Sequence, residues 1–448
     1  MKNKKLKVLL IIEQCNPEWA SVPLVGYCFY DYISQLAETT LVTHERNRAA
    51  LEKTHPNRDI TYICESAFIK KYYALAEKLS KLKDRVIWPL YHMLTYPVYG
   101  EFNRQVYSRF KESILEGHYD IVHAMTPMMP RYPVKAIKAC TSTPFILGPV
   151  NGGVPFPNGF RKVARQEFSD FNFLRSIGRF IIPGYRETYT KADYILVGST
   201  YTLNLVKELF DITDDKIELF YENGIGSSFL KNEESISEIS ARASKTINLL
   251  FVGRLVPYKG ADMLIEAISS LEPAIQNKIH LTIVGDGSER KALELQVEKV
   301  NLTKIIDFTG WVEQKETLQY YSNSDIFCFP SIREFGGAVV LEAMANGLPC
   351  IVVNNGGIGE YVTEETGFRI DPVSKEFVVK ELRNCVEQLV SNNVQRHTMS
   401  LKAIQRVKEF TWSAKAEAVV RIYNKLSAHR TLIGSVTEVP VKSSANPH

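Results

Sequence analysis

Short apolar runs rich in β-branched residues alternate with helical patterns along most of this 448-residue chain. Runs that are apolar on both faces are typical of strands in a parallel sheet that helices cover on both sides. Strand–helix alternation on this scale predicts an α/β architecture with right-handed crossovers. The predicted strands lie within residues 7–12, 119–125, 144–150, 192–199, 247–254, 279–287, 305–312, 324–331 and 349–355, and two helical patterns lie at 261–273 and 288–300.

A polar stretch rich in Ser and Glu, residues 232–246, divides the chain into halves that are each large enough for a Rossmann-like sheet. Residues 68–118 depart from the alternation because they are rich in aromatic residues and Lys, and we expect an insertion of helices and loops there. The predicted division is 1–235 for an N-terminal Rossmann-like domain with the insertion at about 68–118, 236–246 for a linker, 247–412 for a C-terminal Rossmann-like domain, 413–428 for a C-terminal helix and 429–448 for a flexible tail.

Composition and charge narrow the class of protein. The net charge is only +4, so nothing in it predicts a nucleic-acid partner. The seven cysteines are scattered without a CxxC pair, which predicts neither a zinc site nor a disulfide framework and favours a reducing compartment. The first apolar run, residues 8–12, is too short for a signal peptide, and no run has the length needed to cross a bilayer. We therefore expect a cytoplasmic protein.

Residues 251–268 place two cations beside the start of a helix. A strand ends at Gly253, the loop that follows carries Arg254 and Lys259, and the helix begins near Gly260. Loops at the carboxyl ends of parallel strands bind ligands in α/β proteins, and a helix N-terminus with nearby cations favours an anion. Arg can hold phosphate oxygens with its planar fork, while Lys adds a mobile point charge. A solvated loop with two surface cations is the alternative.

Residues 333–349, REFGGAVVLEAMANGLP, place two carboxylates around a glycine pair. We expect a loop through Gly337 and a helix over 338–345 that Gly347 ends. The glycines would let a ligand approach the backbone amides at the helix start. Glu334 and Glu342 could each accept hydrogen bonds from two adjacent hydroxyls, as sugars offer them. The alternatives are an ordinary loop acid and an exposed helix acid.

Several motifs occur in one order, namely FVGRLVPYKG, VGDG, FTGWV, SIREFGGAVVLEAMANGLPCIV and NNGGIGEYV. In this order they closely resemble the C-terminal half of family 4 glycosyltransferases, whose mark is the E-x7-E pattern, here Glu334 to Glu342. The resemblance covers most of residues 247–425. In the N-terminal half, residues 120–127, 145–157 and 221–225 look like a subgroup of the same family.

The resemblance implies a GT-B fold, in which two Rossmann-like domains face each other across a cleft. It places the nucleotide-sugar donor on the C-terminal domain and the acceptor on the N-terminal one, and it implies that helix 413–428 returns to the N-terminal domain. Arg254 and Lys259 would hold the donor diphosphate and stabilise the leaving group. Glu334 would bind hydroxyls of the transferred sugar, and Glu342 the ribose.

The resemblance also assigns backbone and acceptor-side positions. Gly310 and Val312 would lie against the base, and His123 would approach the transferred sugar from the opposite domain. The implied catalytic residues are Glu334, Lys259, Arg254 and His123; the donor-binding residues are Arg254, Lys259, Gly253, Gly310, Val312, Glu334, Phe335, Gly336, Gly337 and Glu342; the acceptor-side residues are His123, Asn151 and Gly152.

Three positions depart from the family pattern. Many relatives carry a Gly-Gly loop after the first strand, and here only Gly26 falls near that place. Met125 stands where many relatives have a second His, and Gly226 stands where an Asp is usual. These departures put the phosphate contact of the N-terminal domain and the role of His123 in question.

The function that the resemblance implies is a retaining, metal-independent glycosyltransferase without a cofactor. It would move a hexose-type sugar from a nucleotide sugar, UDP before GDP, to a saccharide or lipid-linked saccharide in surface polysaccharide synthesis. An epimerase-like enzyme of the same fold and a non-catalytic nucleotide-sugar-binding protein are the alternatives. The aromatic residues and lysines of segment 68–118 leave open a contact with the inner face of a membrane, and ordinary packing on the N-terminal domain is the other interpretation.

Overall fold

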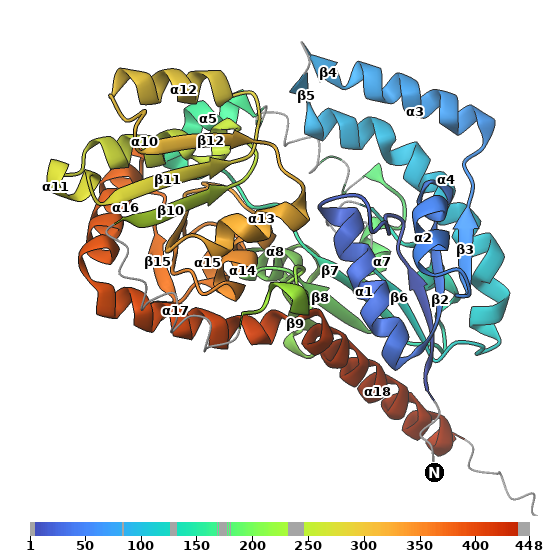
Figure 1. The fold of residues 1–448 in the computed structure, drawn as a ribbon. Helices are drawn as coiled ribbons and strands as arrows, with labels where there is room; N and C mark the ends of the chain where they lie inside the picture. The colour runs from blue at the N-terminus through green and yellow to red at the C-terminus, as the bar shows by residue number, and fades with distance from the viewer. Residues whose placement is uncertain are drawn as a thin grey trace, which may run out of the picture.

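The computed structural model describes residues 5–82, 85–125, 132–167, 181–231 and 246–437, together with Ser169, Ile177 and Arg179. Two parallel sheets, each covered by helices, form two domains that stand side by side (Figure 1). The predicted α/β class with two Rossmann-like domains is therefore confirmed. The predicted linker 236–246 lies outside the described residues except for its last position.

The N-terminal sheet has the strand order β3-β2-β1-β6-β7-β8-β9, with every pair parallel. Leu9 of β1 is paired with Thr40 of β2 on one side and Val122 of β6 on the other. All four residues of β6 are buried, as expected for a strand covered on both faces. The strands are β1 Lys7–Ile11, β2 Glu38–His44, β3 Ile60–Ile63, β6 Ile121–Ala124, β7 Phe145–Val150, β8 Tyr194–Val197 and β9 Ile217–Leu219.

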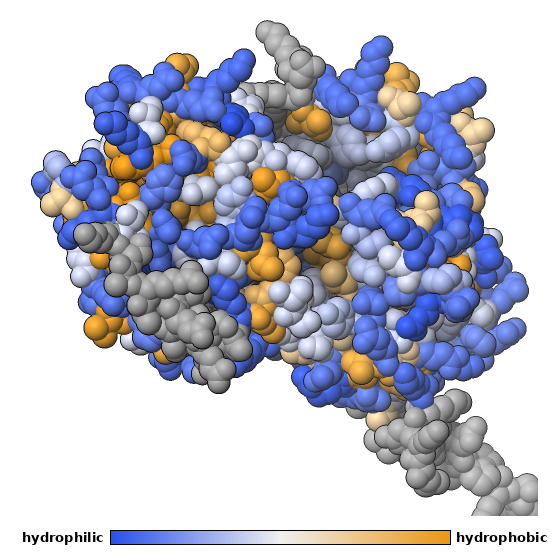
Figure 2. All heavy atoms as spheres, in the orientation of Figure 1, coloured by the Kyte–Doolittle hydropathy of each residue, from blue (hydrophilic) through white to orange (hydrophobic). Residues whose placement is uncertain are grey.

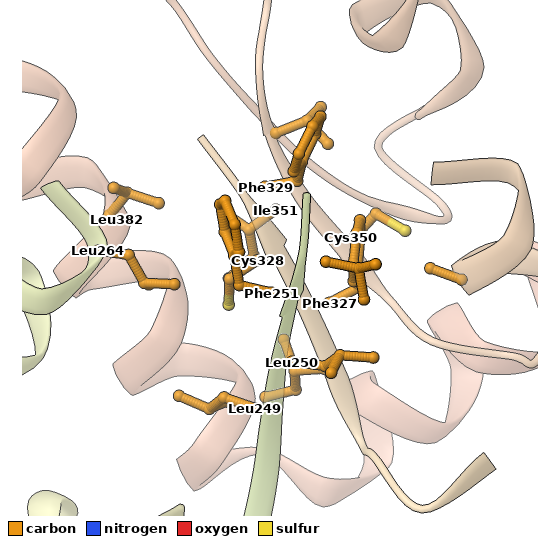
Figure 3. Packing of buried hydrophobic residues seen from close by; sticks show 14 of the residues in the cluster. Leu249, Leu250, Phe251, Leu264, Phe327, Cys328, Phe329, Cys350, Ile351 and Leu382 are labelled. Carbon is orange, nitrogen blue, oxygen red and sulfur yellow. The ribbon is translucent and has the colours of Figure 1, made fainter. Parts of the chain in front are cut away.

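The C-terminal sheet has the order β12-β11-β10-β13-β14-β15, also parallel throughout. Its centre is aromatic: the ring of Phe329 lies 5.7 Å from that of Phe251 and 5.8 Å from that of Phe327 (Figure 3). This packing forms the floor beneath the loops that follow β10 and β13. The strands are β10 Ile247–Val252, β11 Ile279–Val284, β12 Ile306–Gly310, β13 Ile326–Phe329, β14 Cys350–Val353 and β15 Gly367–Ile370.

Helices connect the parallel strands, as crossovers in such sheets require. The helix predicted over 338–345 is observed with those bounds. The helices are α1 Val22–Leu36, α2 Arg48–Thr54, α3 Ala67–Leu79, α4 Trp88–Leu115, α5 Arg161–Gln166, α7 Tyr185–Lys191, α8 Thr200–Phe210, α10 Ala261–Ser269, α11 Pro273–Gln276, α12 Arg290–Lys299, α13 Gln314–Ser322, α14 Ala338–Ala345, α15 Ile358–Tyr361, α16 Lys375–Ser391, α17 Asn393–Val407 and α18 Trp412–Thr437.

All nine predicted strands are present, and the two parallel sheets hold four more among the described residues: β2, β3, β9 and β15. Strands β3, β9 and β15 are short and lie at sheet edges, where one neighbour is missing and the apolar pattern is weaker. Strand β2, with the sequence ETTLVTH, begins with three polar residues that hide its buried second half. The apolar pattern of the sequence therefore predicted the central strands of both sheets and missed several strands at or near the sheet edges.

The segment predicted as an insertion, 68–118, folds as a hairpin of two helices. Strands β4 Lys81–Leu82 and β5 Arg85–Val86 lie between α3 and α4 and pair antiparallel. On α4, Tyr99 is buried and its ring stacks on Tyr132 at 4.9 Å. Ordinary packing therefore accounts for the buried aromatic residues of α4.

The C-terminal helix α18 packs on α1 of the N-terminal domain (Figure 1). Trp412 meets the ring of Phe29 edge-on at 5.2 Å. The helix continues to Thr437, so residues 429–437, expected as part of a flexible tail, are helical; residues 438–448 lie outside the described residues. Once a helix has formed, adding residues to its end has no new nucleation cost. The uneven apolar pattern of residues 429–437 did not indicate this extension.

The membrane-crossing question has one structural answer. Across the described ranges, no helix combines the length and the apolar character that a bilayer span requires.

The buried residue His123 connects α18 to the sheet, and its titration makes the stability of the protein depend on pH. The hydroxyl of Tyr423 lies 2.6 Å from Nδ1 of His123, and Nε2 lies 2.7 Å from the carbonyl oxygen of Gly148. Burial lowers the pKa of His123 from 6.5 to about 4. As the pH falls, the unfolded chain therefore takes up a proton first. The stability that comes from this group is complete above about pH 6.5 and is lost toward pH 4.

Between pH 7 and pH 5, we expect the wild-type chain to lose about 2 kcal/mol more unfolding free energy than His123→Gln, because only the wild type has this ring. Urea unfolding of both proteins at the two pH values measures the difference. NMR of the wild-type ring is the second readout and should show a neutral imidazole at about pH 5. Equal acid sensitivity of the two proteins, or a protonated wild-type ring, would contradict the prediction.

Candidate active site

The two loops that carry the predicted donor residues lie next to each other at one edge of the C-terminal sheet. Strands β10 and β13 are neighbours in the sheet, although β11 and β12 separate them in the sequence. The strand order reverses at this point, and open α/β sheets bind ligands at such switch points. Arg254 and Lys259 follow β10, whereas Glu334 and the glycine pair follow β13.

A glycine allows the two loops to touch. Gly260 has a φ of 73°, and a Cβ at this position would lie 2.4 Å from the carbonyl oxygen of Pro330. The amide of Ile332 donates a hydrogen bond of 2.9 Å to the carbonyl of Tyr258, which joins the same two loops. Close backbone approach therefore brings residue 259 beside residue 334.

Lys259 and Glu334 form an ion pair at the base of the site. Lys259 is buried, and its ammonium group lies 4.8 Å from the centre of the Phe329 ring. The hydroxyl of Ser331 lies 3.4 Å from the same carboxylate oxygen of Glu334. A buried ammonium is well placed to exchange its carboxylate for a phosphate oxygen when, as here, its charged partner among the described residues faces a cavity.

Two arginines add positive charge to the site. The guanidinium of Arg254 is exposed and donates a hydrogen bond of 2.7 Å to the hydroxyl of Tyr258. Arg333, which the sequence analysis did not single out, donates from Nε to the carbonyl of Val154 at 2.8 Å. Its guanidinium lies 5.1 Å from the Phe335 ring, and burial lowers its pKa. Its only sequence signal is its place directly before Glu334.

The glycine pair brings the first turn of α14 to the site. Gly337 has a φ of 55° and precedes the first residue of the helix. The carbonyl of Phe335 accepts a hydrogen bond from the side-chain amide of Asn151, 3.0 Å away in the other domain. The free amides at this helix start carry partial positive charge, which adds to that of the cations.

These loops form one wall of a cavity of about 830 Å³ between the domains. The volume fits a nucleotide sugar or another ligand of that size. The opposite wall includes Val22, Trp88 and Glu222 of the N-terminal half. Among the predicted site residues, those that line the cavity are Gly253, Arg254, Lys259, Glu334, Phe335, Gly336, Gly337 and Asn151.

Glu222 is a second residue that the sequence analysis did not single out, although it lies within the quoted motif YENGI. It lines the cavity, and burial raises its pKa to about 7, with a further rise from the charge of Glu334. Asn151 is hydrogen-bonded to it and lowers the pKa in part, as does Lys415. The cavity therefore holds a carboxyl group that can change its charge near neutral pH.

Three predicted donor residues are not among those that line this cavity. Both carboxylate oxygens of Glu342 accept hydrogen bonds of 2.8 Å, from the amide of Gln314 and the hydroxyl of Tyr321. Burial raises the pKa of Glu342. Gly310 and Val312 lie at and just beyond the end of β12, on the outermost strand of the sheet. Their roles toward a ribose and a base stay predictions.

Two predicted acceptor-side residues also lie off the cavity wall. His123 is fully buried, and both ring nitrogens are engaged by Tyr423 and Gly148. The amide of Gly152 donates a hydrogen bond of 3.1 Å to the hydroxyl of Thr202. In this structure the surroundings of His123 are those of a packing residue.

The loop after β1 is where this sequence departs from the Gly-Gly pattern of many relatives. Gly26 lies in α1, where a Cβ would be 2.3 Å from the carbonyl oxygen of Gln14, so this glycine serves helix packing. Ser21, which precedes α1 and lines the cavity, has a φ of 69°, a value that glycine adopts more easily.

Metal ligands have a clear structural test. Within the part of the chain that the structure describes, no group of three or more His, Cys, Asp or Glu side chains could hold a metal ion. Metal independence of the reaction stays a prediction.

A known family model matches the C-terminal half of the chain. Residues 232–406 match the family model described as "Glycosyl transferases group 1". An uncharacterized glycosyltransferase of Methanocaldococcus jannaschii is 27% identical over 243 residues, which are 54% of this chain and 62% of the relative. D-inositol 3-phosphate glycosyltransferase of Corynebacterium glutamicum is 26% identical over 54% of this chain and 60% of its own length. The matches thus span about three fifths of these relatives.

Comparison with solved structures identifies the fold of both domains together. The Anabaena protein HepE in complex with UDP superimposes with a TM-score of 0.60 at 16% identity, over 94% of this chain and 100% of that one. The lipopolysaccharide outer core galactosyltransferase WaaB gives a TM-score of 0.60 at 14% identity, over 95% of this chain and 100% of that one. The predicted GT-B fold of the two domains is therefore confirmed.

Replacement of Gly336 tests whether the walls of the cavity must touch. A Cβ there would lie 2.0 Å from Nδ2 of Asn223 and 2.4 Å from Oε1 of Glu222. We expect Gly336→Ala to lower the unfolding free energy by about 1–3 kcal/mol, or to separate the walls and weaken UDP binding.

Gly100→Ala is the matched control. Gly100 lies in α4, and no atom lies within 4 Å of a Cβ built there. Alanine should leave binding unchanged and stabilise the helix by up to about 1 kcal/mol. Calorimetry with UDP and urea unfolding measure both variants. A Gly336→Ala protein that is indistinguishable from Gly100→Ala would show that the contact is unnecessary.

Proposed function

We propose that this chain is a retaining glycosyltransferase of family 4 that transfers a hexose-type sugar from a nucleotide sugar, with UDP as the carrier. The observation that carries the proposal is the ion pair of Lys259 and Glu334 at the switch point, beside Arg254 and the first turn of α14. It combines cations for a diphosphate with a carboxylate for sugar hydroxyls in one cavity.

The comparisons support the carrier and the reaction class. The group 1 match covers both loops of the site. The Anabaena neighbour binds UDP and has also been crystallised with UDP-glucose. We choose UDP over GDP on this basis, and we choose transfer over epimerisation because the matched family and the named neighbours are transferases.

Donor binding begins with the diphosphate. Arg254 and Lys259 hold its oxygens, and the ammonium of Lys259 shares its charge between the phosphate and Glu334. The amides of Phe335, Gly336 and Gly337 point at the same group from the start of α14. Glu334, released from part of its pairing, accepts hydrogen bonds from hydroxyls of the transferred sugar.

Transfer is a front-face displacement. The bond between the anomeric carbon and the β-phosphate oxygen breaks, and the acceptor oxygen bonds to the same face of that carbon. The acceptor proton passes to the departing phosphate oxygen, so the reaction needs neither a protein base nor a metal. The cations stabilise the negative charge that develops on the leaving group, and preorganised charges of this kind lower the barrier most.

The acceptor enters from the N-terminal wall. Trp88 and His92 of α4 and Val22 of α1 line this side and offer apolar and aromatic surface to a sugar ring. We propose a saccharide or lipid-linked saccharide of a surface polysaccharide as the acceptor, and the cytoplasm as the compartment. Six of the cysteines are free thiols, which suits a reducing environment: Cys15, Cys28, Cys64, Cys328, Cys350 and Cys385.

Two alanine variants test the site. Lys259→Ala and Glu334→Ala should each reduce sugar transfer at least about 100-fold, because each removes a group that acts on the donor. The assay measures UDP release from UDP-glucose and UDP-galactose with a panel of saccharide acceptors. Lys259→Ala should also reduce the thermal stabilisation by UDP.

Lys299→Ala and Glu298→Ala are the matched controls, since both side chains are exposed on α12. They should retain wild-type transfer and UDP stabilisation. Near-normal turnover in Lys259→Ala would refute the assigned site. UDP stabilisation of the wild type without turnover on any donor would favour the non-catalytic binding protein.

A further inference from the structure

Helix α3 presents an apolar face that nothing in the described chain covers. Phe68 is 74% exposed, Leu75 53% and Leu79 58%. At 3.6 residues per turn, these three side chains lie within about 20° of one line along the helix. Ile69 and Ala76, on another side of α3, are buried and account for its attachment to the domain. The exposed stripe is therefore additional to the face that holds the helix in place.

Lysines flank this stripe on one side. Lys71 and Lys78 project about 60–80° from the apolar line on the same helix. Both side chains are exposed, and neither makes an ion pair with any residue that the structure describes. Figure 2 shows hydrophobic and hydrophilic side chains side by side on the upper part of the N-terminal domain, where Figure 1 shows α3.

The hairpin extends this surface toward the cavity. Trp88 and Met93, in the first turns of α4, are 46% and 48% exposed. Trp88 stacks on His92 with ring centres 5.8 Å apart, and both residues line the cavity between the domains. A hydroxyl–hydroxyl hydrogen bond of 2.9 Å between Tyr73 and Tyr91 joins α3 to α4. One rigid hairpin thus carries the apolar face and part of the acceptor wall.

We propose that the exposed face of α3 docks the protein on a lipid bilayer with anionic headgroups. Phe68, Leu75 and Leu79 insert among the acyl chains near the headgroups, and Lys71 and Lys78 meet the negative charge, which is the arrangement of interfacial helices. The shape fits a bilayer better than a protein partner, because the side chains form a convex ridge on a helix. Scattered single exposed residues elsewhere on the chain need no such partner.

Docking also defines the acceptor. A bound hairpin holds the mouth of the cavity at the headgroup level, where the saccharide of a lipid-linked acceptor lies. This consequence rests on the proposed transferase function, whereas the docking itself does not. The surface therefore selects acceptors that stay in the membrane over free saccharides.

Vesicle sedimentation of the full-length protein tests the docking. The probes are vesicles of phosphatidylglycerol mixed with phosphatidylcholine, and vesicles of phosphatidylcholine alone. We expect binding to the mixed vesicles that weakens with salt. The triple variant Phe68→Ser, Leu75→Ser, Leu79→Ser should bind at least about tenfold more weakly. Each of Lys71→Gln and Lys78→Gln should weaken binding by about fivefold.

Matched controls use exposed residues of the other domain. Leu295 and Val394 are 64% and 77% exposed, and the pair Leu295→Ser, Val394→Ser should bind vesicles as the wild type does. Lys278→Gln and Lys299→Gln are the charge controls. All variants should keep the thermal stabilisation by UDP. Because UDP stabilisation and vesicle binding are measured separately, a failure of donor binding in the wild type can be distinguished from a failure of docking.

Three outcomes would overturn the proposal. The first is no binding of the wild type to anionic vesicles, and the second is equal binding by the triple variant and its control pair. The third is a wild-type dimer in analytical ultracentrifugation that the triple variant abolishes, since the stripe would then bind a second copy of the chain.

Discussion

The ion pair between Lys259 and Glu334 is the interaction around which the site is organised. Neither charge could be buried alone without a large desolvation penalty, so each requires the other until a ligand arrives. The pair forms only because β10 and β13 are neighbours and Gly260 lets their loops touch. A diphosphate can replace the carboxylate at the ammonium while sugar hydroxyls occupy the carboxylate. The resting pair thus has the charges of the proposed complex already in place.

The two walls of the cavity are held by contacts that involve backbone carbonyls. Arg333 donates to Val154, and Asn151 donates to Phe335, so each domain supplies one donor. Two backbone hydrogen bonds also join Ile225 to the segment before α18: the amide of Ile225 donates to the carbonyl of Phe410, and the amide of Trp412 donates to the carbonyl of Ile225. From there α18 continues along α1 and packs on the N-terminal domain.

Much of this site was predictable from sequence. Arg254, Lys259, Glu334 and the glycine pair were found because they follow strands whose apolar runs are unmistakable, and all of them line the cavity. The surroundings of His123 could not be predicted, because its partner Tyr423 is 300 positions away and its burial depends on α18. Arg333 and Glu222 were not singled out, since single charged residues in loops carry no pattern until the opposite domain is in place.

By itself, the sequence determined the strand–helix alternation and the two sheets. It also determined that the loop with Arg254 and Lys259 comes before the segment with Glu334 and Glu342. These are local properties, set by the period of apolar residues and by glycine positions. Only the tertiary structure decided that Glu342 bonds to Gln314 and Tyr321, that burial raises the pKa of Glu222 to about 7, and that no described residue covers the apolar line of α3. Each of these depends on which distant residues exclude water from a side chain, and local pattern does not contain that information.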